Sequence, residues 1–117
     1  MKDKFLIGSV AGAATVPVSE VRPPQGSDGY LYFSCADFDR ITVQVAVDGA
    51  TPSSNVDLQG TNFDPADDVW TEIGNVDAVS TNGVIKVVDL CYRYARVVVS
   101  AVNAGADTCD VAIYLVS

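Results

Sequence analysis

Arg93 to Asn103 reads Arg-Tyr-Ala-Arg-Val-Val-Val-Ser-Ala-Val-Asn and is the longest uninterrupted β-type run in the chain. Alternate residues of an extended strand face opposite sides, so one face of this stretch is wholly apolar, formed by Ala95, Val97, Val99 and Ala101. A strand of this length without Gly or Pro needs partners along both edges and at least one covered face. The stretch therefore predicts the central strand of a β-domain.

The composition indicates the same class. The chain has 117 residues, enough for one domain with its own hydrophobic core. It contains twenty Val and seven Thr against five Leu and one Met, and β-branched residues suit a pleated sheet better than a helix. Seven or eight strands at a spacing of about ten residues predict an all-β fold, an antiparallel β-sandwich or jelly roll with no helix longer than one turn.

Strict alternation of apolar and polar residues locates most of the other strands. It is clearest at 40–47, where four apolar side chains share one face: Ile41, Val43, Val45 and Val47. Further strands are expected at 29–35, 55–61, 69–73, 84–90 and 109–116. Asn82-Gly83 is typical of a turn, and the last two strands are expected to form an antiparallel hairpin.

Residues 1–28 follow a different pattern, with a stretch of small residues before two prolines. The absence of helix caps and of a helical period predicts an extended N-terminal arm in front of a sandwich domain at 29–117. Such an arm either pairs with the domain's own sheet as an edge strand or lies on a neighbouring molecule. The interface residues of the arm would be Phe5, Leu6, Ile7, Val10, Val16 and Val18.

The start of the chain also imitates a signal peptide. Asp3 lies in the region that should be purely basic, and Gly8, Ser9 and Gly12 interrupt the apolar run, so we expect the segment to stay in the mature protein. No window approaches the ~18 consecutive apolar residues of a membrane span. We therefore expect no contact with membranes.

The formal net charge is -8, from thirteen Asp and two Glu against seven Lys and Arg. Eight acidic residues and a single base, Lys86, lie between Asp48 and Asp89. This half of the chain would repel a phosphate backbone. Nucleic-acid binding is therefore not expected.

The sequence offers little for catalysis. It contains no His, which removes the Ser-His and Cys-His arrangements. Asp64, Asp67 and Asp68 cluster in one loop, where they could act as an acid pair on glycosides or as oxygen ligands for Ca²⁺. Turn chemistry alone also produces such a loop, with Asp capping backbone amides, and this interpretation is favoured. We expect no catalytic residue, no cofactor and no metal.

Cys35, Cys91 and Cys109 show no Cys-x-x-Cys spacing. The favoured interpretation is three buried thiols in a chain made in a reducing cytoplasm. The alternative is a disulfide between Cys91 and Cys109.

Four aromatic residues, Phe63, Trp70, Tyr92 and Tyr94, could form a platform for sugars, although packing between strands explains them as well. Alternation places Tyr92 and Tyr94 on one face. Arg93 and Arg96 are expected to pair with the acidic loops. Tyr92, Tyr94 and Arg96 are the candidate surface contacts.

Four segments, taken in order, carry a family resemblance: Ile-Thr-Val-Gln-Val-Ala-Val-Asp-Gly from Ile41, Val-Asp-Leu-Gln-Gly-Thr-Asn-Phe-Asp from Val56, Val-Trp-Thr-Glu-Ile from Val69, and the run from Asn82 to Val99. This order resembles small β-sandwich structural proteins of tailed bacteriophage virions. The likeness covers about residues 40–116 and is carried by the ordered set rather than by any one motif. The chain departs from the pattern at 63–68 and at its N-terminal segment.

The resemblance implies a virion protein without catalytic residues, made in the host cytoplasm. Its role would be that of a capsid decoration (cement) protein or of a head or tail accessory protein, with the major capsid protein or another virion protein as partner. A homo-oligomer is expected, with a trimer favoured. The competing hypothesis is a β-sandwich module that binds a carbohydrate or a host receptor.

Overall fold

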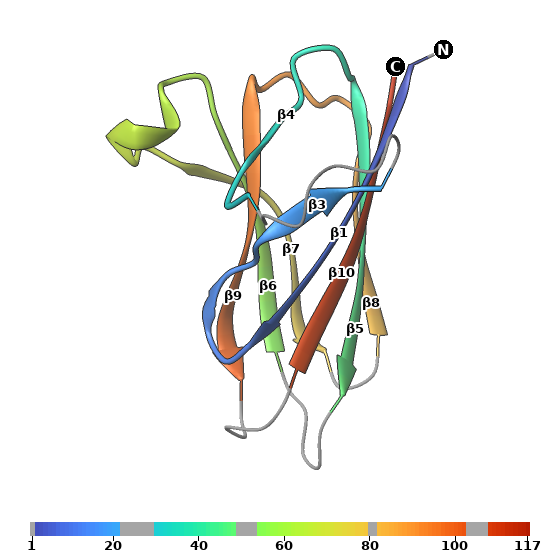
Figure 1. Cartoon of the computed structure of the whole chain (residues 1–117), viewed down its shortest axis with the longest axis vertical. Coiled ribbons are helices and arrows are strands. Elements are labelled where there is room, and N and C mark those ends of the chain that lie inside the picture. The colour runs from blue at the N-terminus through green and yellow to red at the C-terminus, as the bar shows by residue number, and fades with distance from the viewer. Residues whose placement is uncertain (1, 22–29, 49–53, 80–81, 103–107) are drawn as a thin grey trace.

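A computed structural model describes residues 2–21, 30–48, 54–79, 82–102 and 108–117. These residues form ten strands and one short 3-10 helix (Figure 1). In chain order the elements are β1 (Asp3–Ala11), β2 (Ala14–Thr15), β3 (Val18–Glu20), β4 (Phe33–Ser34), β5 (Arg40–Asp48), β6 (Ser54–Thr61), η1 (Pro65–Asp67), β7 (Thr71–Val79), β8 (Asn82–Val87), β9 (Tyr94–Val102) and β10 (Thr108–Val116). No helix in these ranges has the length and apolar character needed to cross a bilayer.

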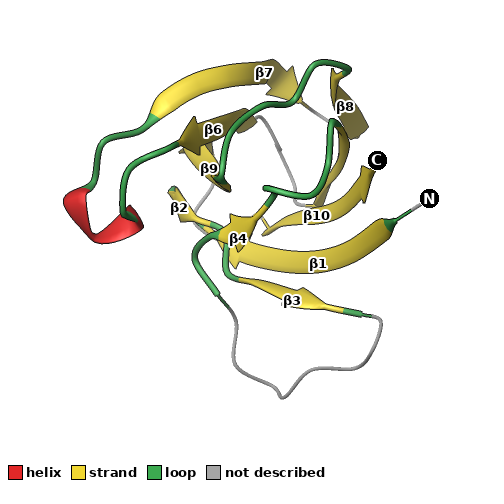
Figure 2. Cartoon of the chain, turned by 90° about the horizontal axis from the view of Figure 1, so that it is seen from above, coloured by secondary structure: helices red, strands yellow, loops and turns green. Residues whose placement is uncertain are grey.

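The strands form two antiparallel sheets that face each other across the core (Figure 2). Sheet A has the order β3-β1-β10-β5-β8, and sheet B has the order β2-β9-β6-β7, with β4 also paired to β9. The expected all-β class is therefore confirmed, in a sandwich-like arrangement of antiparallel sheets. The jelly-roll form of the prediction stays a prediction.

The core lies between the sheets and is built from the alternating apolar residues of both. Sheet B contributes Ala95, Val97 and Val99 of β9, each at most 1% exposed, as the central-strand interpretation requires. Sheet A contributes a matching set from two neighbouring strands: Ile41, Val43, Val45, Val111, Ile113 and Leu115. Because each side chain points off its strand at a period of two, the local pattern alone determines which residues face inward.

The N-terminal segment is part of the sandwich, which corrects the expectation of an extended arm. β1 pairs with β10 from Asp3 opposite Val116 to Ala11 opposite Thr108, and its other edge pairs with β3. β2 crosses over to pair with β9 of sheet B. Of the two alternatives, pairing with the domain's own sheet is the one observed. The predicted domain boundary at residue 28 lies outside the described residues.

Gly8 is the reason that the sequence pattern does not predict β1 as a strand. It occupies an inward position of β1, where a Cβ would collide with the carbonyl oxygen of Pro17 and lie 2.9 Å from Cγ1 of Val16. The close approach of the β2–β3 segment therefore requires a residue without a side chain. This glycine interrupts the apolar alternation that would otherwise have indicated a strand.

The predicted hairpin of the last two strands is wrong. β9 belongs to sheet B and pairs with β6, β2 and β4, whereas β10 belongs to sheet A and pairs with β1 and β5. Both strands are fully apolar on one face, and these faces pack against each other across the core. The turn expected at Asn82-Gly83 is also wrong, since both residues pair with β5 as the first residues of β8.

Candidate functional site

The outward side of sheet A is the strongest candidate for a binding surface. Its central row crosses four strands, with Ile7 beside Ala112, Ala112 beside Gln44, and Gln44 beside Val84. We call this surface the sheet A face and define it by Phe5, Ile7, Thr42, Gln44, Val84, Ala112 and Tyr114. Ile7 is 50% exposed and Val84 is 56% exposed. Large apolar side chains are thus exposed to solvent on β1 and on the edge strand β8.

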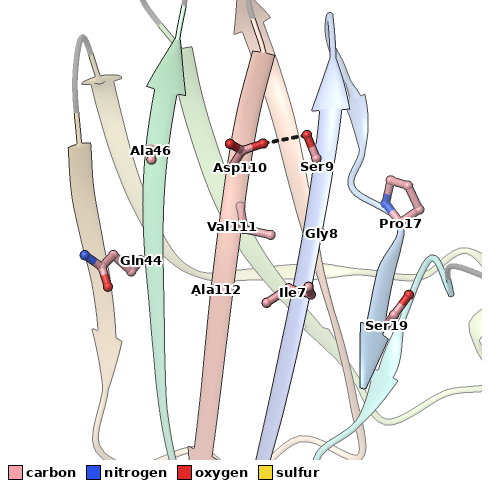
Figure 3. Close-up of a pocket in the computed structure, with 10 residues that line it drawn as sticks. All are labelled: Ile7, Gly8, Ser9, Pro17, Ser19, Gln44, Ala46, Asp110, Val111 and Ala112. Carbon is pink, nitrogen blue, oxygen red and sulfur yellow. Dashed lines mark hydrogen bonds between the residues drawn. The ribbon is translucent and has the colours of Figure 1, made fainter. Parts of the chain in front are cut away.

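A hollow of about 700 Å³ lies in this face (Figure 3). Ala112 and Ala46 have short side chains there, while Ile7, Pro17 and Gln44 rise around them. The alternation of short and long side chains in one row produces the depression. Its lining is mainly apolar, as is typical of ligand and protein contact sites.

A second hollow of about 420 Å³ continues the first, since Gln44 and Ala112 line both. Phe5 and Tyr114 form its far side, with ring centroids 6.4 Å apart and a tilt of 55°. The Tyr114 hydroxyl donates a hydrogen bond to Asp3 Oδ2 at 3.1 Å, which holds the ring in place. The sheet A face is therefore one continuous, partly hollowed surface.

Two of the polar side chains at this site bind each other. Ser9 Oγ donates a hydrogen bond to Asp110 Oδ1 at 2.6 Å (Figure 3). Both residues are exposed, and a carboxylate is too weak a base to activate a serine without an imidazole between them. The arrangement suits contact with a partner better than a nucleophilic reaction.

The opposite side of the molecule has a different character. Asp57 of β6 and Glu72 and Asp77 of β7 are close enough to interact. The pKa of Glu72 is raised, first because its protonated form donates a hydrogen bond to Asp57 and then because of the negative charges of Asp57 and Asp77. Sheet B thus bears an acidic outer surface, on the opposite side of the molecule from the mainly apolar hollow of sheet A. The two sides would attract different partners.

The six residues predicted for an arm interface divide between core and surface. Leu6, Val16 and Val18 are at most 3% exposed, so they are core residues and cannot contact a partner. Val10 is half-buried against the same core. Phe5 and Ile7, which alternate with Leu6, are the members that belong to the sheet A face.

Tyr92 and Tyr94 do not share a face, contrary to the prediction. Tyr92 covers Gly60 at one end of the core, where a Cβ on the glycine would lie 2.7 Å from Cγ of the ring. The Tyr92 carbonyl oxygen accepts a hydrogen bond from the Cys35 thiol at 2.9 Å. Tyr92 precedes β9, so strand alternation does not reach it.

Tyr94 lies on the outer side of β9 and meets Tyr32 edge to face, with centroids 5.8 Å apart. The guanidinium carbon of Arg93 lies over the Tyr94 ring, 5.6 Å from its centroid. A hollow of about 300 Å³ at this position is also lined by Tyr30 and Lys4. The sequence pattern did not predict that Tyr94 would meet Tyr30 and Tyr32, because they lie on segments distant in the chain.

Arg96 is held on the outer side of sheet B by three contacts. Its guanidinium carbon lies 4.4 Å from the Trp70 ring centroid, its Nε donates to Gln59 Oε1 at 2.7 Å, and it forms an ion pair with Asp68 at 3.5 Å. The predicted pairing of Arg96 with the acidic loop is confirmed. Phe63 is 60% exposed nearby. Arg96 thus ties the loop to the sheet and has little freedom to bind an anion.

The acidic loop contains the capping interactions that turn chemistry favours. Asp64 precedes η1, and its Oδ1 accepts a hydrogen bond from Ala66 N at 2.9 Å. Asp68 ends η1 in the left-handed region at φ 54°. Among the described residues no group of three or more acidic, Cys or His side chains is arranged to hold a metal ion.

The three cysteines are free thiols, so the alternative of a Cys91–Cys109 disulfide is wrong. Cys35 and Cys109 are buried as expected, but Cys91 is exposed. Burial raises the pKa of Cys35 to about 11, with a small opposing effect of Lys4, and burial followed by the charge of Asp110 raises the pKa of Cys109 to about 11.

These positions predict the thiol reactivity of the native protein. The thiolate is the reactive form, so a raised pKa lowers its fraction at a given pH. At pH 8 we expect one thiol, Cys91, to react rapidly with a disulfide reagent, and all three to react after denaturation. Mass spectrometry of the labelled peptides identifies the site. Rapid labelling of Cys35 or Cys109 in the folded protein would contradict their burial.

Comparison with known proteins finds similarity to solved structures. No family model matches the chain, and no curated protein matches it. The crystal structure of the SPBc2 prophage-derived protein YomS is similar at a TM-score of 0.49 and 13% sequence identity, over 98% of this chain and 96% of that chain. A likeness at this TM-score and identity does not extend to function.

Proposed function

We propose that the chain is a non-enzymatic structural protein of a bacteriophage virion, a capsid decoration (cement) protein that attaches through the sheet A face. The observation that carries the proposal is the exposed Ile7 in a hollowed, mainly apolar surface of a chain with net charge -8. Exposed apolar surface of this kind is typical of protein contact sites. The sequence resemblance to virion β-sandwich proteins supports the particle as the place of contact.

The size of the sheet A face suits such a contact. Nine residues of β10 extend about 30 Å, and the five strands of sheet A extend about 20 Å across. The face therefore offers roughly 600 Å², somewhat below the ~800 Å² that each partner buries in a standard interface. Many copies on one particle need only modest affinity per contact.

The partner that fits is the major capsid protein or another virion protein with an apolar surface. A tail or neck accessory role would use the same face and the same chemistry. The acidic outer surface of sheet B would then point away from the particle, into solvent. The protein would be made in the host cytoplasm and retained in the virion.

Substitution of Ile7 by Lys tests this proposal. The lysine would place a charge beside the hollow of the sheet A face, and we expect the affinity for particles to fall at least about tenfold, or roughly 1.4 kcal/mol. The measurement is co-sedimentation of the chain with purified particles of the virus that encodes it. Because Ile7 faces away from the core, the melting temperature should change little.

Val69→Lys is the matched control, because Val69 is 49% exposed and lies outside the sheet A face, next to β7. It should bind particles as the unchanged chain does. Equal binding by the Ile7 variant, or absence of the chain from purified virions by mass spectrometry, would overturn the proposal.

A carbohydrate or host-receptor module is the second candidate, favoured by the tyrosine-lined hollow of Tyr30, Tyr32 and Tyr94. Aromatic side chains that are exposed beside polar groups are suited to sugar rings. A glycan array separates the two functions, since binding that is lost on Tyr32→Ala would favour the module and absence of binding would favour the decoration protein.

A further inference from the structure

The sandwich protects three of its four sheet margins and leaves β8 open. A sheet edge presents unpaired backbone groups that can pair with another chain, so proteins shorten, bend or charge such strands. At the β3 margin the strand is three residues long, and Val18 exchanges hydrogen bonds with Tyr30 at 2.8 and 2.7 Å. At the margin beside β9 only the two-residue strands β2 and β4 are present.

The third margin, β7, is irregular and acidic. Its pairing with β6 shifts register twice, and it carries Glu72 and Asp77. Register shifts and charges are both devices that discourage a further strand. β7 is therefore a poor template for pairing.

β8 has only one of these protections, the charge of Lys86. It pairs with β5 over six consecutive residues without a register shift, and within the described residues its other side forms no backbone hydrogen bond. It contains no Pro, one charged residue (Lys86), and an exposed Val84, and Val88 just beyond it is 56% exposed. Figure 2 shows β8 and β3 at opposite margins of sheet A.

We propose that β8 is the contact between two copies of this chain, pairing antiparallel with β8 of the second copy about a two-fold axis at Val84. This inference rests on the proposed function, because it names the contact between copies that a decoration protein would use. Sheet A would continue across both molecules as one sheet of ten strands, and the two sheet A faces would lie side by side on a single surface.

The residues of β8 fit an antiparallel pair with a second β8 strand in this register. Val84 would face Val84 of the second copy, and Lys86 would face Asn82, so the two lysines are kept apart. Lys86 is also the single base in the acidic half of the chain, which reduces repulsion between copies at this edge. The short β3 at the far margin cannot accept a β8 strand. Strand pairing would therefore stop at a dimer and would not extend to further copies.

A cysteine at position 84 tests the geometry. In a Cys91→Ser background, Val84→Cys should form an intermolecular disulfide under mild oxidation, because residues directly opposite in an antiparallel pair have Cβ atoms about 4.5–5.5 Å apart. Lys86→Cys is the matched control and should stay uncrosslinked, since the two copies of residue 86 would be four residues apart along the strands. Crosslinking at 86 but not at 84 would overturn the two-fold axis at Val84.

The mass of the unmodified chain tests the dimer itself. Analytical ultracentrifugation up to roughly 1 mM, where a contact of about 4 kcal/mol is half formed, should detect it. Val84→Lys should weaken dimerisation at least about tenfold, whereas Ile7→Lys should leave it unchanged. A monomer at every concentration, or a trimer as the resemblance implies, would overturn the inference. Loss of particle binding by Ile7→Lys in a chain that stays monomeric would overturn this inference alone. A dimer whose particle binding is unaffected by Ile7→Lys would overturn the proposed function alone.

Discussion

Removal of residues 1–18 is expected to leave the chain unable to fold. The deletion takes away β1, β2 and three fully buried side chains, Leu6, Val16 and Val18. Each such side chain contributes about 1.5–3 kcal/mol by burial, and β10 would lose the partner along one whole edge. Because domains of this size are stable by only about 5–15 kcal/mol, the loss removes most or all of the stability.

The measurement is circular dichroism and a two-dimensional NMR spectrum of the truncated chain. An arm that merely fastens the protein to a neighbour would leave both unchanged. A cooperative melting transition and dispersed amide signals in the truncated chain would contradict the role of β1 as a structural strand.

Two single substitutions within β1 refine this test. Leu6→Ala should lower the free energy of unfolding by about 3 kcal/mol, because it removes a buried side chain and leaves a cavity. Ile7→Ala, at the next residue on the solvent side, should change it by about 0.5 kcal/mol or less. Similar values for the two would show that the strand does not face the core as described.

Val97→Lys is expected to cost about 3–5 kcal/mol of unfolding free energy or to prevent folding. Val97 is 1% exposed at the centre of β9, and the substitution would place an ammonium group among the apolar side chains of both sheets with no partner. Chemical denaturation followed by tryptophan fluorescence measures the loss.

Val98→Lys is the matched control one residue along the same strand. Val98 is half-buried on the outer side of sheet B and lies opposite Asp57 of β6. A lysine there gains an acidic neighbour across the strands, so the free energy of unfolding should stay within about 0.5 kcal/mol. If the two variants were equally stable, the assignment of the β9 faces would be wrong.

The candidate site was only partly predictable. The sequence predicts Ile7 as an interface residue of an arm, but no local pattern indicates that Gln44 and Ala112 lie beside it. These residues come from three strands that are distant in the chain and adjacent in sheet A. Their neighbourhood depends on strand order, which no local pattern encodes. Gly8 interrupts the apolar alternation of β1, the strand that carries Ile7. A glycine is required there because Val16 and Pro17 approach the strand too closely to leave room for a side chain.

Local alternation determined the faces of β5, β6, β9 and β10, because the direction of a side chain along a strand depends only on its position in the two-residue period. The Val-rich composition also determined the all-β class, because β-branched side chains pack better on a pleated sheet than in a helix. Tertiary structure alone decided that β9 and β10 lie in opposite sheets. Each has one fully apolar face, and packing those faces together buries more apolar surface than pairing the strands edge to edge. The same choice made β10 the centre of sheet A, brought β1 to its side, and left Ile7 exposed on the surface where we propose the partner binds.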